Sequence, residues 1–161
     1  MIALILACAT ATDSAEEAPV TVVPSEGAWT IAWDTTYGGD CKLADMATRQ
    51  PATIEWTVEL EETGFTMRDE FNYPMGCDVA GDTFACSLGT YHVPWDDSGY
   101  DATEYIGTDL SGTFADPEHF TADYTIHAEC EGGDCAEVGL QYGDAFTYPC
   151  SAVAGMTGTS G

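Results

Sequence analysis

Four acidic side chains fall within one irregular stretch of the sequence, between Trp95 and Tyr105. They are Asp96, Asp97, Asp101 and Glu104. Calcium binds clustered carboxylate and carbonyl oxygens of this kind, so the stretch is a candidate calcium site. Their spacing does not follow that of an EF-hand loop, and the chain holds 28 Asp and Glu residues in all. A solvated acidic loop is therefore the alternative interpretation.

Aromatic side chains flank the same stretch, at Tyr91, Trp95, Tyr100 and Tyr105. Aromatic rings at the rim of a loop can contact the face of a sugar or an apolar ligand. Together with Trp29, which opens an earlier apolar segment, these residues are the candidate ligand contacts. The alternative is that they cap one end of the core.

Motifs for other chemistry do not occur. The sequence has no Gly-x-Ser-x-Gly elbow, no phosphate-binding loop and no Rossmann glycine pattern. His92, His119 and His127 lack metal-ligand spacing. A carboxylate pair for glycoside hydrolysis could be drawn from so many acids that the pattern favours no pair. We therefore expect no enzyme, and no cofactor apart from the candidate calcium ion.

Seven cysteines divide into an even set and one remainder. Six lie between Cys41 and Cys150, and the seventh, Cys8, follows a short apolar run. An even set in a short chain indicates disulfides, here three, and hence an oxidising compartment.

The charge is strongly negative. Against the 28 acids stand only Lys42, Arg49 and Arg68, giving a net charge of −25. Binding to nucleic acid requires a basic surface, which this composition excludes. Because the acids are spread along the chain, a hydrated surface coat is their simplest role.

Alternation of apolar and polar residues predicts an all-β fold. Residues Thr53 to Leu60 alternate throughout, which indicates a strand with one buried face. Eight strands are expected, near 28–34, 52–60, 64–70, 74–80, 83–91, 105–115, 119–130 and 135–149. Short turns between neighbours favour an antiparallel meander that closes into a barrel, with a β-sandwich as the alternative. A short helix or a loop is expected near 44–50.

The turn Gly81-Asp82 sets the register of one hairpin. It places Cys77 opposite Cys86 on the apolar face, where a cross-strand disulfide fits. Cys130 and Cys135 share a loop and are the expected second pair. A simple two-residue turn there would put Val138 on the wrong face, so another turn or a bulge is expected. Cys41 and Cys150 then pair by elimination.

Residues Ile5-Leu6-Ala7-Cys8 resemble a bacterial lipobox, the signal at which a leader is removed and the cysteine is lipidated. The resemblance implies a membrane anchor at Cys8, and Ala9 implies the outer membrane. Two alternatives stay open. Cleavage at Ala9-Thr10-Ala11 would give a soluble periplasmic or secreted protein, and an uncleaved start would leave a cytosolic terminus with one thiol.

Residues Gly27-Ala28-Trp29 resemble the Gly-x-Trp motif that opens the first strand of lipocalins. The resemblance implies a small barrel that holds apolar ligands. Lipocalins usually place an arginine from a late strand against this tryptophan, and this chain has no arginine after Arg68.

These observations predict four segments. Residues 1–7 are a signal-peptide remnant, 8–25 a lipidated cysteine with a flexible acidic tether, 26–152 a single β domain, and 153–161 a disordered tail. The favoured function is a non-enzymatic envelope module that binds a small or extended ligand. The alternatives are a structural or surface-interaction lipoprotein whose partner is an envelope protein, and a carboxylate hydrolase. Membrane contact is expected through the anchor alone.

Overall fold

A computed structural model describes residues 21–41, 53–141 and 147–161. The lipobox with Cys8, most of the expected tether and the segment near 44–50 lie outside these residues. The elements in chain order are β1 (Gly27–Gly39), β2 (Thr53–Leu60), β3 (Phe65–Arg68), β4 (Pro74–Ala80), β5 (Thr83–Pro94), the 3-10 helix η1 (Asp96–Ser98), β6 (Ala102–Asp116), β7 (His119–Gly132), α2 (Cys135–Gln141) and β8 (Cys150–Ser160).

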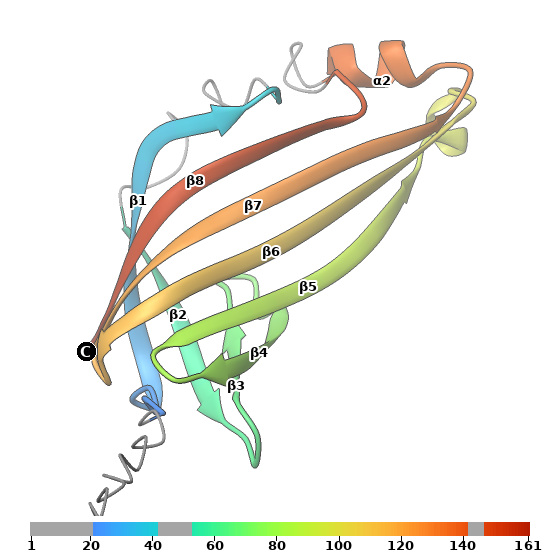
Figure 1. The fold of residues 1–161 in the computed structure, drawn as a ribbon. Coiled ribbons are helices and arrows are strands. Elements are labelled where there is room, and N and C mark those ends of the chain that lie inside the picture. Colours follow the sequence, from blue (N-terminus) through green and yellow to red (C-terminus); the bar gives the residue numbers. More distant parts are fainter. Residues whose placement is uncertain (1–20, 42–52, 142–146) are drawn as a thin grey trace, which may run out of the picture.

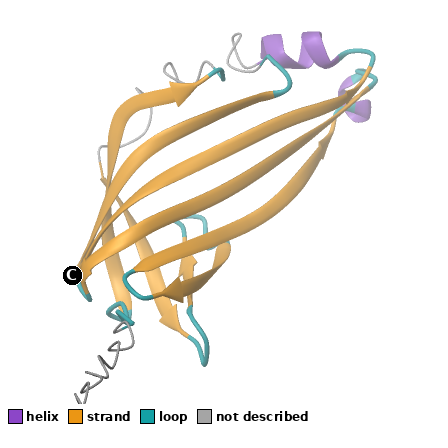
Figure 2. Cartoon of the chain, in the orientation of Figure 1, coloured by secondary structure: helices purple, strands orange, loops and turns teal. Residues whose placement is uncertain are grey.

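The strands form a closed barrel in sequence order, and every neighbouring pair is antiparallel. β8 pairs with β1 and so closes the wall. The expected all-β meander and barrel are confirmed, and the sandwich alternative is wrong. Helix is confined to η1 and α2 among the described residues, both at the same end of the molecule (Figure 2). Neither helix is long and apolar enough to cross a membrane.

The wall of the barrel is uneven in height. β2, β3 and β4 are short, whereas β5 to β8 run on together toward the end that carries η1 and α2 (Figure 1). We call that end the helical end, and the opposite one, near the C-terminus, the packed end. This difference in strand length exposes side chains halfway along the barrel.

The packed end is filled by aromatic rings. Trp29 lies 5.4 Å from Phe120 and 6.5 Å from Phe114, centroid to centroid. Phe84 and Phe114 approach to 4.7 Å. These residues face inward because the period of two puts alternate side chains of each strand inside the barrel. The helical half is instead lined by small residues, Ala128, Ala152 and Ala154, all fully buried.

All three expected disulfides are confirmed. They join Cys77 to Cys86, Cys130 to Cys135, and Cys41 to Cys150. Cys77 and Cys86 are direct cross-strand partners, as the Gly81-Asp82 turn predicts. Cys41 to Cys150 ties the region after β1 to the start of β8, 109 residues away in sequence.

The C-terminal segments differ from expectation. Residues Cys135–Gln141 form helix α2 instead of a strand, and the last strand, β8, covers the residues 153–161 that were expected to be a disordered tail. The helix explains why Val138 did not fit a strand register, since it is fully buried while Leu140 is exposed. β8 forms because its backbone pairs with β1 on one side and β7 on the other, so the β domain extends past 152.

The end of the expected tether is also ordered. Val22 N donates to Gly81 O at 2.8 Å, and Ser25 N donates to Pro117 O at 2.7 Å. Val22 packs on the core, and Trp29 Nε1 donates to Ser25 O at 2.8 Å. Residues 22–25 therefore belong to the packed end, because they satisfy backbone and indole groups there.

Candidate functional site

Aromatic rings from three strands meet halfway along the barrel. Trp33 of β1 lies edge to face with Trp56 of β2, at 6.1 Å, and with Tyr124 of β7, at 5.1 Å. Tyr91 of β5 and Tyr73, just before β4, lie close enough to influence this group electrostatically. We call Trp33, Trp56, Tyr73, Tyr91 and Tyr124 the mid-barrel cluster.

The donors of this cluster are unequally satisfied. Trp56 Nε1 donates to Glu70 Oε2 at 3.1 Å. Trp33 Nε1 is also buried, yet it has no hydrogen-bond acceptor among the described residues. A buried donor without an acceptor costs about 1–3 kcal/mol, so it favours any ligand or water that presents an oxygen to it.

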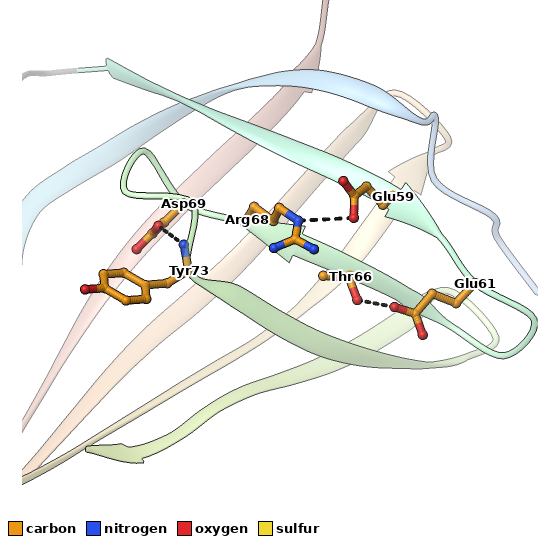
Figure 3. Close-up of polar contacts among 6 residues, drawn as sticks. All are labelled: Glu59, Glu61, Thr66, Arg68, Asp69 and Tyr73. Atoms are coloured by element: carbon orange, nitrogen blue, oxygen red, sulfur yellow. Dashed lines mark hydrogen bonds and ion pairs between the residues drawn. The ribbon is translucent and has the colours of Figure 1, made fainter. Parts of the chain in front are cut away.

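A tight turn between β3 and β4 presents the exposed part of the site. Asp69 Oδ1 accepts a hydrogen bond from Tyr73 N at 2.8 Å (Figure 3). It also accepts one from Phe71 N at 3.0 Å. Asn72 adopts a positive φ of 66°, which Asn tolerates in turns. The turn holds two aromatic rings outward: Phe71 is 73% exposed and Tyr73 is 59% exposed. Tyr91, across from the turn, is 50% exposed.

Buried polar groups lie on the inner face beyond the cluster. Glu104 is fully buried on β6 and accepts a hydrogen bond from the Tyr148 hydroxyl. Burial raises the pKa of Tyr91, and the charge of Glu104 raises it further. Burial also raises the pKa of Tyr124 to about 12, although a hydrogen bond with Thr108 opposes the shift. Both phenols are therefore neutral hydrogen-bonding groups at neutral pH.

Basic side chains are scarce around this site. Arg68 is the single Lys or Arg among the described residues, and its Nε pairs with Glu59 Oε2 at 3.1 Å (Figure 3). The carboxylates of Asp69, Glu70 and Glu104 stand near the cluster. An anionic ligand would be repelled here, whereas a neutral or cationic one would not.

The structure separates the five aromatic residues that the sequence suggested as ligand contacts. Tyr91 joins the mid-barrel cluster, whereas Trp29 is 1% exposed in the core of the packed end. Trp95 and Tyr100 contact each other near η1, with centroids 6.1 Å apart. Tyr105 faces outward against His92. The rim expected at 91–105 is thus not one surface, because alternate residues of a strand face opposite sides.

The four candidate calcium ligands are likewise not brought together. Asp96 and Asp97 are exposed on η1, whereas Glu104 points into the barrel. Asp101 accepts a hydrogen bond from Gly133 N, while its own N donates to Asp134 Oδ2 at 2.8 Å. Within the described part of the chain no group of three or more metal-binding side chains is suitably arranged.

Two cavities lie on the outer wall. One of about 600 Å³ is lined by polar residues such as Asp34, Ser111 and Asp123 and by apolar residues such as Phe84 and Met156. The other, of about 200 Å³, surrounds Gly107, with Tyr105, Asp109 and His127 at its sides. Neither includes a ring of the mid-barrel cluster.

No family model and no curated protein matches this chain. A solved structure described as "Structure of EF1p2_mFAP2b bound to DFHBI" covers 86% of this chain and 94% of its own, with 12% identity and a TM-score of 0.34. That protein is described as bound to DFHBI.

Sequence reasoning missed most of the mid-barrel cluster. Trp33 and Trp56 each lie at inward positions of alternating strands, which predicts burial but not their meeting. Tyr73 precedes β4 in a turn, and nothing in the sequence indicates that this turn lies near Tyr91.

Proposed function

We propose that this protein is an exported, lipid-anchored binding module of the bacterial envelope and not an enzyme, and that its ligand contacts the mid-barrel cluster. The observation that carries the proposal is the exposure of Tyr73 and Tyr91 beside buried rings. Large aromatic surface is costly to leave in water, and exposed apolar groups of this kind mark interaction sites.

The chemistry of the cluster defines the ligand. Its rings favour an apolar body, the Nε1 group of Trp33 favours an oxygen acceptor, and the surrounding carboxylates disfavour an anion. A hydrolase would need two carboxyl groups converging on a substrate. Glu104 is the one buried carboxylate among the described residues, and it is engaged by Tyr148, which supports a binding role over a hydrolytic one.

A neutral apolar dye tests the binding site. Nile red fluorescence should rise on titration with the full chain produced in an oxidising compartment. Tyr73→Ser and Tyr91→Ser should each weaken dye binding several-fold. Leu140→Ser is the matched control, since Leu140 is 61% exposed on α2, away from the cluster. Equal losses in all three variants, or no dye binding by the unchanged protein, would contradict the proposal.

The anchor is tested separately. When the gene is expressed in a bacterium fed a labelled fatty acid, the label should enter the protein and follow the outer-membrane fraction. Cys8→Ala should remove both the label and the membrane association. Retention of label in Cys8→Ala, or secretion of the unlabelled unchanged protein, would refute lipidation at this cysteine.

A further inference from the structure

One stretch of β5 has a partner on one side only. β4 pairs with β5 as far as Gly76 opposite Ser87, whereas β5 pairs with β6 as far as Pro94 opposite Thr103. A register shift between Ser87 and Gly89 separates the two parts. Among the described residues, no strand lies beside residues 89–93 on the side away from β6 (Figure 1).

Backbone groups of this stretch face outward from the sheet. Trp95 N donates to Ala102 O at 3.0 Å, so Trp95 faces β6. Because alternate residues of an antiparallel strand point their N–H and C=O groups to opposite sides, Tyr91 and Val93 also face β6. The N–H and C=O groups of Thr90 and His92 then face the unpaired side, and both residues are exposed.

This edge lacks the usual protection in its middle. Natural sheets guard their edges with charged residues, prolines or bulges. Residues 89–93, Gly-Thr-Tyr-His-Val, carry no Lys, Arg, Asp or Glu. The register shift precedes them and Pro94 follows them, so the unprotected part is limited to a short window. An unprotected edge of this length can pair with a short extended segment, but it is too short to join two whole sheets.

The surroundings select the side chains of such a segment. Residues facing inward beside this edge would approach Tyr91 and Tyr73, which favours apolar groups. The carboxylates of Asp69, Glu70 and Glu104 lie near, while Arg68 is paired with Glu59. A second copy of this chain would bring a net charge of −25 to a surface of the same sign.

We propose that residues 89–93 of β5 are a docking edge to which an extended segment of another polypeptide, alternating basic and apolar residues, adds as a further strand. This inference rests on the proposed function, because it names the ligand class of the same site. Backbone hydrogen bonds to Thr90 and His92 would supply the pairing, and alternate apolar side chains would reach the mid-barrel cluster.

The test uses a short capped peptide that alternates lysine and valine, labelled with a fluorophore, and the full chain. Fluorescence anisotropy should show binding that weakens as salt is raised. His92→Pro removes the outward N–H and should weaken binding by about tenfold. His92→Ala is the matched control, because it removes the ring and keeps the N–H. Circular dichroism should show that both variants keep the β-barrel spectrum.

Peptide variants and oligomeric state complete the test. Methylation of every backbone nitrogen should abolish binding, and a glutamate–valine peptide should not bind. Equal binding by the glutamate peptide, or equal losses in His92→Pro and His92→Ala, would overturn the docking edge. Dimers in native mass spectrometry that His92→Pro abolishes would instead identify a second copy as the occupant. Failure of the unchanged protein to bind the lysine–valine peptide, while it still binds Nile red, would reject this inference and leave the proposed function standing.

Discussion

The rings of Trp33 and Tyr124 meet edge to face in the middle of the barrel, with centroids 5.1 Å apart and planes at 86°. This contact joins the first strand to the seventh and fixes the indole of Trp33 with its Nε1 buried and without an acceptor among the described residues. Trp56 packs on the same two rings but has an acceptor in Glu70. The two tryptophans thus share an environment and differ in their hydrogen bonding.

Replacing each of these tryptophans by phenylalanine should therefore have unequal effects. Both changes remove similar ring area, but Trp56→Phe also removes the hydrogen bond that Trp56 Nε1 donates to the exposed carboxylate of Glu70. We expect Trp56→Phe to reduce the free energy of unfolding by about 1 kcal/mol more than Trp33→Phe. Urea titration followed by far-UV circular dichroism measures the difference. If Trp33→Phe instead lowered the free energy of unfolding by more than Trp56→Phe, the Nε1 group of Trp33 would have a hydrogen-bond acceptor in solution.

A methyl group at Gly158 should disturb the packed end. Gly158 lies directly opposite Phe120, and a Cβ there would lie 2.1 Å from a carbon of its ring. Overpacking of this kind costs about 1–3 kcal/mol, so Gly158→Ala should lower the melting temperature. Gly76→Ala is the control, because a Cβ at Gly76 meets nothing within 4 Å. Adding Phe120→Leu to Gly158→Ala should recover part of the loss.

The three disulfides should contribute unequally to stability. The Cys41–Cys150 bridge spans 109 residues and the Cys77–Cys86 bridge spans 9. In the chain-entropy description, closing the longer loop stabilises by about 4–5 kcal/mol and the shorter by about 2–3 kcal/mol. The paired variants Cys41→Ala/Cys150→Ala and Cys77→Ala/Cys86→Ala, compared by urea unfolding, measure the difference. A larger decrease in the free energy of unfolding for Cys77→Ala/Cys86→Ala than for Cys41→Ala/Cys150→Ala would contradict this prediction.

Ionisation of Tyr124 should lower the free energy of unfolding at alkaline pH. Its pKa is raised from 10.0 to about 12, chiefly by burial. A group whose pKa is higher in the folded state adds stability below its unfolded pKa, and this stability is lost as pH rises through the folded value. We expect a loss of at most about 2–3 kcal/mol between pH 10 and 12. Tyr124→Phe should flatten that part of the profile, and an unchanged slope would contradict the assignment.

Local sequence patterns were sufficient for several elements of the fold. The alternation in Thr53–Leu60 predicted β2 almost to the residue, because one buried face demands a period of two. The Gly81-Asp82 turn predicted the pairing of Cys77 with Cys86, since a two-residue turn fixes the register of the strands it joins. These features depend on neighbours close in the chain.

The candidate site was predicted only in part. Tyr91 was predicted to be a ligand contact and lies in the mid-barrel cluster, whereas Trp33, Trp56 and Tyr73 were not among the predicted contacts. Nothing local to Trp33 indicates that its ring meets Tyr124. The two rings meet because β8 pairs with both β1 and β7 when the barrel closes.

The sequence by itself determined an acidic, disulfide-bonded chain of alternating strands, because composition, cysteine number and the period of two are read directly from residues. Only the tertiary structure decided that residues 150–160 form a strand, that β5 continues past β4, and which rings share the middle of the barrel. The residues of β8 are mostly small and carry little strand preference of their own. They become a strand because closure of the barrel supplies hydrogen-bonding partners on both sides.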